Sequence, residues 1–431
     1  MRARLQAWIE ALGDLFWLRP AVLVIVALAL ALAAVWLDRA VLANRDFTSS
    51  YWAYSGGADG ARALLSAVAA STIGVAGTTF SITIAALSLA SGQMGPRLLR
   101  NFVRDARNQV VLGIFLGTFA YALMVLRTVR TVDETPFVPH VGVFGAIVLA
   151  LLSLATLVWF VHHIATGINV ETVIDSVHRD LCEAIAGQTL DAAGLQPPAA
   201  PPDGMGVGVS NSGYLQAVDV AGLADWACAQ RVTVTLRVRP GAYIPTKAPV
   251  AVVSAGVEGV PEALDRALTF GRRPAALQDL EYSIRQLVEI AVRALSPGIN
   301  DPLTAGSVLD HLGDALCRLA PRHLATGAVA REGRIVLVHA VTSYAGLCDA
   351  MFHLIRQNAA GSVHVLARML DVLCRVAEVE RLTTRVAELR RHADLVITVA
   401  RRSVPDRPDL DDLEERHRAF TTIVAQGYRS A

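Results

Sequence analysis

Four apolar stretches of the sequence constrain the fold more than any other feature. They run from Pro20 to about Leu37, from Arg62 to Gly92, from Gln109 to Val129 and from His140 to His162. A helix needs about 20 apolar residues to cross the hydrocarbon core of a bilayer, and in lipid every backbone polar group must be bonded internally. The stretches therefore predict a domain of four transmembrane helices over residues 20–163.

Composition places a soluble part after this membrane part. The chain of 431 residues is 53% hydrophobic and only 18% charged, whereas soluble domains carry about a quarter charged residues. The apolar excess lies before about His163. Because the net charge is only +1, the chain lacks the general positive field that favours nucleic acid, and we expect no nucleic-acid partner.

The second stretch divides into a polar and an apolar helical face. Small and hydroxyl-bearing residues recur at steps of three or four, so they share one face. They are Ser71, Gly74, Thr78, Ser81, Ala85, Ser88 and Gly92. Another face is apolar and consists of Ile73, Ala76, Phe80, Ile84 and Leu87. Two interpretations of the polar face remain open, because it can line a water-filled path or pack closely against a neighbouring helix.

The placement of arginines predicts the orientation in the membrane. Residues 1–19 form a predicted amphipathic segment that carries arginines, and the loop after the second stretch carries Arg97, Arg100, Arg104 and Arg107. The other two loops mix acidic and basic residues. Since basic loops stay on the cytoplasmic side, we expect the N-terminus and the C-terminal half in the cytoplasm. The loop arginines either lie on anionic lipid or surround the inner mouth of a pore.

The rest of the chain predicts a mixed α+β cytosolic domain. We expect residues 164–195 to extend the fourth membrane helix, residues 196–260 to form a Pro-rich linker and a small β-subdomain, and residues 261–431 to be mainly helical. An apolar stripe in the last segment is typical of a helical bundle. It consists of Leu366, Leu370, Leu373, Val376 and Val379.

The segment SPGINDP, which ends at Pro302, separates two predicted helices. Asp301 is a favourable N-cap and Pro302 suits the first helical position, so the simplest interpretation is a helix-turn-helix corner. The alternative is a ligand or subunit contact, because free N–H groups at a helix start attract anions. The residues available for such a contact are Arg285, Arg293, Ser296, Asn300, Asp301 and Thr304.

No motif indicates a catalytic site, a metal site or a cofactor site. The five cysteines form no CxxC pair, and Walker A, GxGxxG, GxSxG and HExxH motifs are absent. Glu171, Asp175 and His178 share one helical face. A metal site can be drawn from them, but a solvated helix face explains the same spacing. We therefore expect no catalytic residue, no metal and no cofactor.

Three stretches together resemble a known family. They are TTFSITIAALSLASGQMGPRLLRNFVRD, FVHHIATGINVETVI and, most specifically, IAVRALSPGINDPLTA with the upstream RPGAYIPTKAPVAVV. Over nearly its whole length the chain resembles the bacterial predicted membrane proteins catalogued as domain of unknown function 2254. The resemblance implies a membrane N-terminal part in the bacterial inner membrane and a cytosolic C-terminal part. It implies no established activity.

These observations lead to three functional hypotheses. The first is a homo-oligomeric, channel-like protein with a cytosolic gating or sensing domain, because four helices in one subunit leave little room for a water-filled path. Its partners would be membrane lipids, further copies of the chain and a small ion or anionic ligand. The second is a non-conducting membrane sensor or scaffold whose cytosolic domain binds a ligand. The third, which the sequence favours least, is a membrane-associated enzyme.

Overall fold

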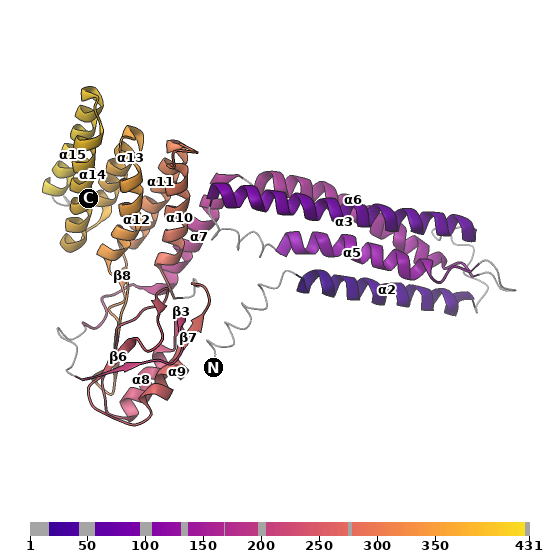
Figure 1. The fold of residues 1–431 in the computed structure, drawn as a ribbon, viewed down its shortest axis with the longest axis horizontal. Coiled ribbons are helices and arrows are strands. Elements are labelled where there is room, and N and C mark those ends of the chain that lie inside the picture. The colour runs from indigo at the N-terminus through magenta and orange to yellow at the C-terminus, as the bar shows by residue number, and fades with distance from the viewer. Residues whose placement is uncertain are drawn as a thin grey trace. The chain divides into compact units, whose positions relative to one another are not determined.

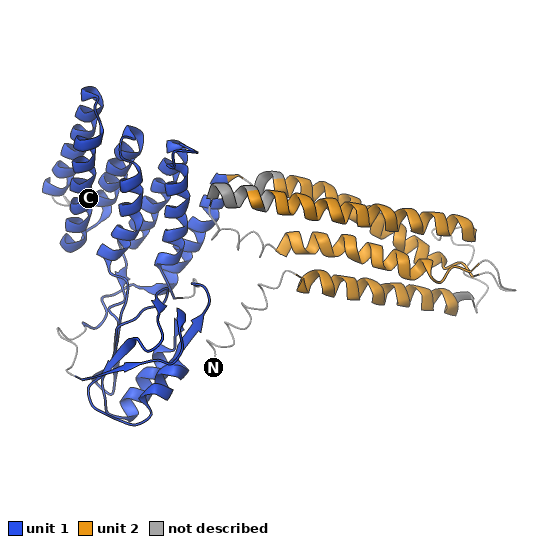
Figure 2. Ribbon diagram, viewed as in Figure 1, with its two compact units in different colours: residues 1–4, 170–431 blue, residues 5–169 orange. Residues whose placement is uncertain are grey.

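The structure is a computed structural model of the whole chain, and it describes residues 17–42, 57–94, 106–130, 137–167, 169–196, 204–274 and 278–426. The chain divides into two compact units (Figure 2). The membrane unit is Leu5–Asn169, and the C-terminal unit contains Val170–Ala431. Each unit has buried apolar clusters of its own.

Four long helices make up the described part of the membrane unit (Figure 1). They are α2 (Leu18–Leu42), α3 (Ala58–Met94), α5 (Ala106–Leu126) and α6 (His140–Gly167). All four are long and apolar enough to cross a membrane, which confirms the prediction of four apolar helices. The predicted amphipathic segment 1–19 lies outside the described residues up to residue 16.

Small residues let the helices of the membrane unit approach one another closely. α5 packs against α2, α3 and α6. A Cβ atom added to Gly117 of α5 would lie 3.2 Å from the Cβ atom of Ala27 on α2. The hydroxyls of Thr118 and Ser153 lie 3.0 Å apart and join α5 to α6. The interior between these helices is therefore filled by side chains, as close packing in lipid requires.

Three sheets occur in the described part of the C-terminal unit. The five-stranded sheet has the order β2–β6–β4–β10–β9, the three-stranded sheet has the order β5–β3–β7, and β1 pairs with β8. β10 runs parallel to β4, and the other pairs are antiparallel. The strands are β1 (Thr189–Leu190), β2 (Met205–Gly208), β3 (Gly213–Val218), β4 (Val234–Leu236), β5 (Tyr243–Ile244), β6 (Pro249–Val253), β7 (Leu268–Gly271), β8 (His323–Leu324), β9 (Ala328–Arg331) and β10 (Arg334–His339).

The β region is not confined to the predicted segment 196–260. β10 lies inside the five-stranded sheet and β7 lies at the edge of the three-stranded one, although both follow residue 260. Val336 and Leu337 of β10 are fully buried in the same core as Val234 of β4. The sequence of Arg334–His339 favours a short strand, which the structure contains as β10. A short strand carries no local signal of its pairing partner, so its place in the five-stranded sheet could not be predicted.

Nine helices belong to the described part of the C-terminal unit. They are α7 (Val170–Gln188), α8 (Val220–Ala229), α9 (Val260–Ala267), α10 (Glu281–Ala294), α11 (Pro302–Leu319), α12 (Tyr344–Asn358), α13 (Val363–Val379), α14 (Thr383–Ser403) and α15 (Arg407–Gln426). α7 is separate from α6, because α6 ends at Gly167 and Asn169 is not helical. The predicted continuous extension of the fourth membrane helix is thus a distinct helix.

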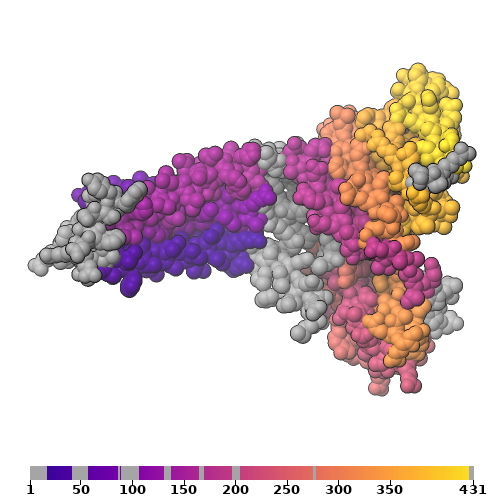
Figure 3. Space-filling view, turned by 180° about the vertical axis from the view of Figure 1, so that it is seen from behind, coloured from indigo at the N-terminus to yellow at the C-terminus, as the bar shows by residue number. Residues whose placement is uncertain are grey.

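The helices α10 to α15 stack in two layers. One layer holds α10, α12 and α14, the other holds α11, α13 and α15, and each helix contacts the next one in its layer. The stack runs in sequence order through the unit (Figure 1), and its surface is continuous from orange to yellow in Figure 3. Most of the predicted stripe on α13 is buried, but Val379 is 39% exposed. The helical part is thus a two-layer stack in which neighbouring helices pack on one another.

Candidate functional site

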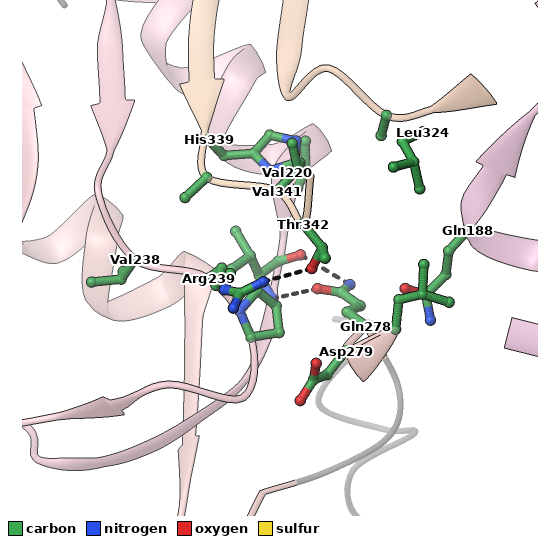
Figure 4. A pocket seen from close by; sticks show the side chains of 15 residues that line it. Gln188, Val220, Val238, Arg239, Gln278, Asp279, Leu324, His339, Val341 and Thr342 are labelled. Carbon is green, nitrogen blue, oxygen red and sulfur yellow. Dashed lines mark hydrogen bonds between the residues drawn. The ribbon is translucent and has the colours of Figure 1, made fainter. Parts of the chain in front are cut away.

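A small pocket lies inside the C-terminal unit, between strand ends and the start of α10 (Figure 4). Its volume is about 190 Å³, which is below the range of drug-sized ligand sites. The polar residues that line it are Gln188, Arg239, Gln278, Asp279, His339 and Thr342. The larger apolar residues that line it are Val218, Val220, Val238, Leu280, Leu324 and Val341. The pocket can therefore hold a small ligand against a largely apolar wall.

Arg239 brings a positive charge to this wall. Its Nη1 atom donates to the Oε1 atom of Glu281 and, at 2.6 Å, to the hydroxyl of Thr342. Within the described residues, no hydrogen bond engages its Nε or Nη2 atoms. An arginine has five N–H donors in a fixed fork that matches a carboxylate. The guanidinium thus has donors to spare for a ligand.

Two buried carboxylates anchor the start of α10 beside Arg239. The side chains of Asp279 and Glu281 are 3% and 7% exposed. Arg285, one turn further along α10, donates to the Oε2 atom of Glu281 at 2.8 Å and also to the Oδ2 atom of Asp279. Buried carboxylates are tolerated when they are paired and hydrogen-bonded. Two guanidiniums and two carboxylates therefore form a balanced network at the pocket.

Gly241 lets this network form. Its φ of +89° is a left-handed conformation that favours glycine, and the Asp279 carboxylate and the Arg285 guanidinium occupy the space where a Cβ atom would lie. The glycine is the third residue of the sequence RPG, whose arginine and proline both line the pocket. The tripeptide thus supplies two successive lining residues and the glycine that accommodates the carboxylate of Asp279 next to them.

Gln278 closes another side of the pocket by bonding to a strand end. Its amide oxygen accepts from the backbone N–H of Val218 at 2.9 Å, and its amide nitrogen donates to the Val218 carbonyl at 3.2 Å. These two bonds tie the segment before α10 to the end of β3. They also satisfy both backbone groups of Val218, which would otherwise lose their partners at the end of the strand.

Burial shifts the pKa values of two ionisable groups that line the pocket. Burial lowers the pKa of His339, so its imidazole is neutral at neutral pH. Burial also raises the pKa of Asp279 above its ordinary value, although Arg285 opposes this shift. The lining consequently offers a guanidinium, an amide, a hydroxyl and a neutral imidazole as polar binding groups.

The predicted pore-lining or packing residues of α3 all lie on its outer surface in the single chain. Ser71, Gly74, Thr78, Ser81 and Ser88 are exposed. The residues that α3 buries form a different stripe, which consists of Ala61, Leu65, Ala69, Thr72, Ala76 and Thr79. The hydroxyl-bearing face is thus not used for packing within the described part of one chain.

Two of these exposed hydroxyls bond to their own helix. Ser71 donates to the carbonyl of Val68, and Thr78 donates to the carbonyl of Gly74, each at 3.1 Å. Such bonds allow a hydroxyl to face lipid or another helix without an unsatisfied donor. Arg97, Arg100 and Arg104 lie outside the described residues, and Arg107 is exposed in the first turn of α5.

The SPGINDP corner is held by bonds within the chain. The Asp301 carboxylate accepts from the backbone N–H groups of Leu303 and Thr304, each at 3.1 Å, and from the Thr304 hydroxyl at 2.6 Å. The hydrogen bond from the Thr304 hydroxyl holds the pKa of Asp301 below its ordinary value. Asn300 adopts a left-handed φ of +50° in the turn. A carboxylate of the chain itself therefore caps the start of α11.

The predicted cationic residues of this corner point to other partners. Arg285 belongs to the pocket network, as described above. Arg293 pairs with Glu289 one turn earlier at 3.6 Å, and the Ser296 hydroxyl donates to the Arg293 carbonyl at 2.6 Å. The structure therefore does not gather these side chains into one site around Asn300. A ligand or subunit contact at the corner stays a prediction.

The comparison with known proteins gives the family of the chain. The model of the predicted membrane proteins named DUF2254 matches residues 14–375. The chain belongs to the DUF2254 family. Uncharacterized proteins of Mycobacterium tuberculosis (strain CDC 1551 / Oshkosh) and Mycobacterium bovis are each 34% identical to it over 363 residues, which cover 81% of this chain and 70% of theirs. No solved structure matches the chain.

Sequence reasoning missed most of the pocket in this DUF2254 protein. The RPG tripeptide that starts at Arg239 was the available signal, because it opens one of the stretches that carry the family resemblance. Asp279 precedes α10 and Glu281 is its first residue. Acidic residues are common at helix starts, because they cap free N–H groups and interact favourably with the helix dipole, so neither residue indicated a pocket. Thr342 lies 103 positions from Arg239, and nothing in either local sequence connects the two.

Proposed function

We propose that this DUF2254 protein is a membrane-anchored sensor whose C-terminal unit lies in the cytoplasm and binds a small organic anion in the pocket at Arg239. The observation that carries the proposal is a guanidinium with uncommitted donors on an otherwise largely apolar wall. The cytoplasmic side is supported by the arginines at the N-terminus and in the second loop.

The size and lining of the pocket define the ligand class. A carboxylate would take paired N–H bonds from Arg239. The apolar wall of Val218, Val238 and Val341 would cover a short hydrocarbon body. The carboxylates of Asp279 and Glu281 are balanced by the guanidiniums of Arg285 and Arg239, so they leave no net negative charge to oppose this ligand. A short-chain monocarboxylate fits these requirements.

Thermal unfolding of the purified full-length protein tests this proposal. Propionate, butyrate and isovalerate would each be titrated, and saturable stabilisation by at least one of them is expected, since a ligand that binds only the folded state raises its stability. Arg239→Gln should abolish the stabilisation. Arg237→Gln is the matched control, because Arg237 lies two positions away and is exposed. Equal stabilisation of all three proteins would exclude the Arg239 site.

A second candidate function rests on the outer face of α3. The exposure of Ser71, Thr78 and Ser81, with no atom within 4 Å of a Cβ atom added to Gly74, leaves room for a second copy of the chain. Copies arranged around an axis would place these hydroxyls along a shared path, which the packed interior of one chain does not offer. The assembly would then be channel-like.

Substitution of Thr78 and Ser81 with leucine separates conduction from packing. If the face lines water, the double variant keeps its assembly but alters the current across a reconstituted bilayer. If the face only packs, assembly is lost. Leucine at Ile82, which is already 43% exposed and apolar, is the control that should change neither property. A wild-type protein that carries no current at any pH or tension would remove the channel hypothesis.

A further inference from the structure

A cluster of metal-binding side chains lies between α7 and α11, away from the pocket lining. His178 and Cys182 are one turn apart on α7, and Asp314 approaches them from α11. Their potential ligand atoms all lie within 4.8 Å of one another. The sequence placed His178 on a solvated helix face. It gave no sign that the Cys182 thiol, four positions away, and the Asp314 carboxylate, 136 positions away, would join His178.

We propose that His178, Cys182 and Asp314 bind a divalent transition metal of the zinc type. Nitrogen, thiolate and carboxylate ligands are the set that Zn²⁺ uses in proteins. All five cysteines of the chain are free thiols, so Cys182 is available as a ligand. The metal would fasten α7 to α11 within the C-terminal unit. This inference is independent of the proposed ligand pocket.

The distances fit a tetrahedral ion with little movement. Bonds of about 2.1 Å to nitrogen and about 2.3 Å to sulfur place those two atoms about 3.6 Å apart in a tetrahedron. The Cys182 Sγ atom lies 3.4 Å from the Nε2 atom of His178. The same Nε2 atom lies 2.9 Å from the Oδ2 atom of Asp314, so the carboxylate must move outward by about half an ångström. The metal would take the place of the Nε2 proton that these atoms now share.

The surroundings of the cluster suit a cation. The Oδ1 atom of Asp175 lies 3.0 Å from the Nε2 atom of His311. The His311 ring packs edge-on against His178 at a centroid distance of 4.9 Å. Glu171 bonds the Ser307 hydroxyl at 2.8 Å. Two further carboxylates therefore line the same helix pair.

One group of the chain competes with the metal. The Nε atom of Arg318 donates to the Oδ2 atom of Asp314 at 2.6 Å. Its side chain is 59% exposed and comes from the same helix, so it can swing into solvent when a metal binds. No protein ligand is assigned to the fourth position, which leaves it to water, as in zinc sites with an open position.

Cobalt binding to the full-length protein in detergent micelles tests the proposal, because a bound thiolate gives Co²⁺ a charge-transfer absorption band. We expect one equivalent of Co²⁺ with this band, and its displacement by Zn²⁺. Cys182→Ser should remove the band. Cys374→Ser, which changes a partly buried thiol on α13, should retain it. A band that persists in Cys182→Ser, or the absence of any stoichiometric binding, would overturn the site.

A second variant distinguishes the loss of a metal ligand from the loss of the folded structure. Asp314→Asn keeps the shape of the side chain and removes its charge. It should weaken Zn²⁺ binding by more than about tenfold, since even outer-shell partners of a metal site contribute that much. Circular dichroism without metal shows whether each variant is folded. An Asp314→Asn protein that is folded and binds Zn²⁺ as tightly as the wild type would contradict the assignment.

Discussion

The carboxylate of Asp38 on α2 caps the start of α6. Its two oxygens accept from the backbone N–H groups of Val141 and Gly142, each at 2.9 Å. Asp38 is only 3% exposed. The first N–H groups of a helix lack partners within that helix, and here a neighbouring helix supplies them. The contact fixes the relative position of α2 and α6 through two residues, Asp38 and Val141, that are 103 positions apart in the sequence.

We expect Asp38→Ala to lower the stability of the membrane unit by about 2 kcal/mol. The estimate combines the loss of an N-cap with the cost of leaving buried donors unsatisfied. The midpoint of thermal unfolding in detergent would measure the loss. Asp59→Ala is the control, because Asp59 is exposed in the first turn of α3. An unchanged midpoint in Asp38→Ala would show that the cap contributes no stability.

The capping aspartate illustrates what the sequence could and could not predict. Apolar length alone predicted four membrane helices, and the Asp-Pro pair predicted the start of α11, because both signals are local. The partner of Asp38 depends on how two helices cross, and the pairing of β10 with β4 depends on a contact between distant segments. The same holds for the pocket, where Arg239 meets Thr342 only after the sheets have formed.

The hydroxyl-bearing face of α3 shows a second limit of prediction from the sequence. The spacing of Ser71, Thr78 and Ser81 correctly put them on one side of a helix. Periodicity does not say which side a neighbouring helix covers, and in the single chain the neighbours cover the side of Ala69 and Ala76 instead. Two helical faces that both consist of small residues can pack equally well, so the sequence could not choose between them.

Gly241→Ala should destabilise the pocket network. A methyl group would meet the Asp279 carboxylate and the Arg285 guanidinium, and the φ of +89° is unfavourable for alanine. We expect a loss of about 2 kcal/mol or more, from strain together with a disturbed buried ion pair. Thermal unfolding of the C-terminal unit within the full chain would report it.

Gly256→Ala serves as the matched substitution in the same β region. It is exposed, and no atom lies within 4 Å of the added Cβ atom. Its effect should stay within about 0.5 kcal/mol. If both variants unfold at the same temperature, the close approach at Gly241 does not constrain the fold.

Two glycines of the membrane unit should respond in opposite directions to alanine. The Cβ atom of Gly145→Ala would meet the hydroxyl of Tyr121, which donates to the Gly142 carbonyl at 3.2 Å. Overpacking of this kind costs about 1–3 kcal/mol. Gly74→Ala meets no atom within 4 Å in the single chain. It should stabilise the isolated subunit by up to about 1 kcal/mol, since alanine favours helix more than glycine.

Thermal unfolding at low and high protein concentration separates the subunit from the assembly. A Gly74→Ala protein that is stabilised at low concentration but assembles less well would place a second copy against α3. Stabilisation under both conditions would mean that no other chain contacts Gly74. A Gly145→Ala protein as stable as the wild type would contradict the packing of α5 against α6.

His392 should make the C-terminal unit less stable in mild acid. Its side chain is fully buried between α12 and α14, and burial lowers its pKa to about 4. Arg391 and His353 act in the same direction, whereas Asp349, 3.2 Å from its Nε2 atom, opposes them. An unfolded histidine has a pKa of about 6.5. Between these two values the unfolded state binds more protons, so the free energy of unfolding falls as the pH falls.

Thermal unfolding at pH 6.5 and pH 5 would measure this effect, which amounts to about 2 kcal/mol over that interval. His392→Gln removes the titrating group, so its stability should depend less on pH by about that amount, even if it is less stable at every pH. His417→Gln removes a more exposed histidine that pairs with Asp394 and should keep the wild-type dependence. If the slopes of His392→Gln and the wild type agree, protonation of His392 does not drive the acid sensitivity, and the buried imidazole must tolerate its charge.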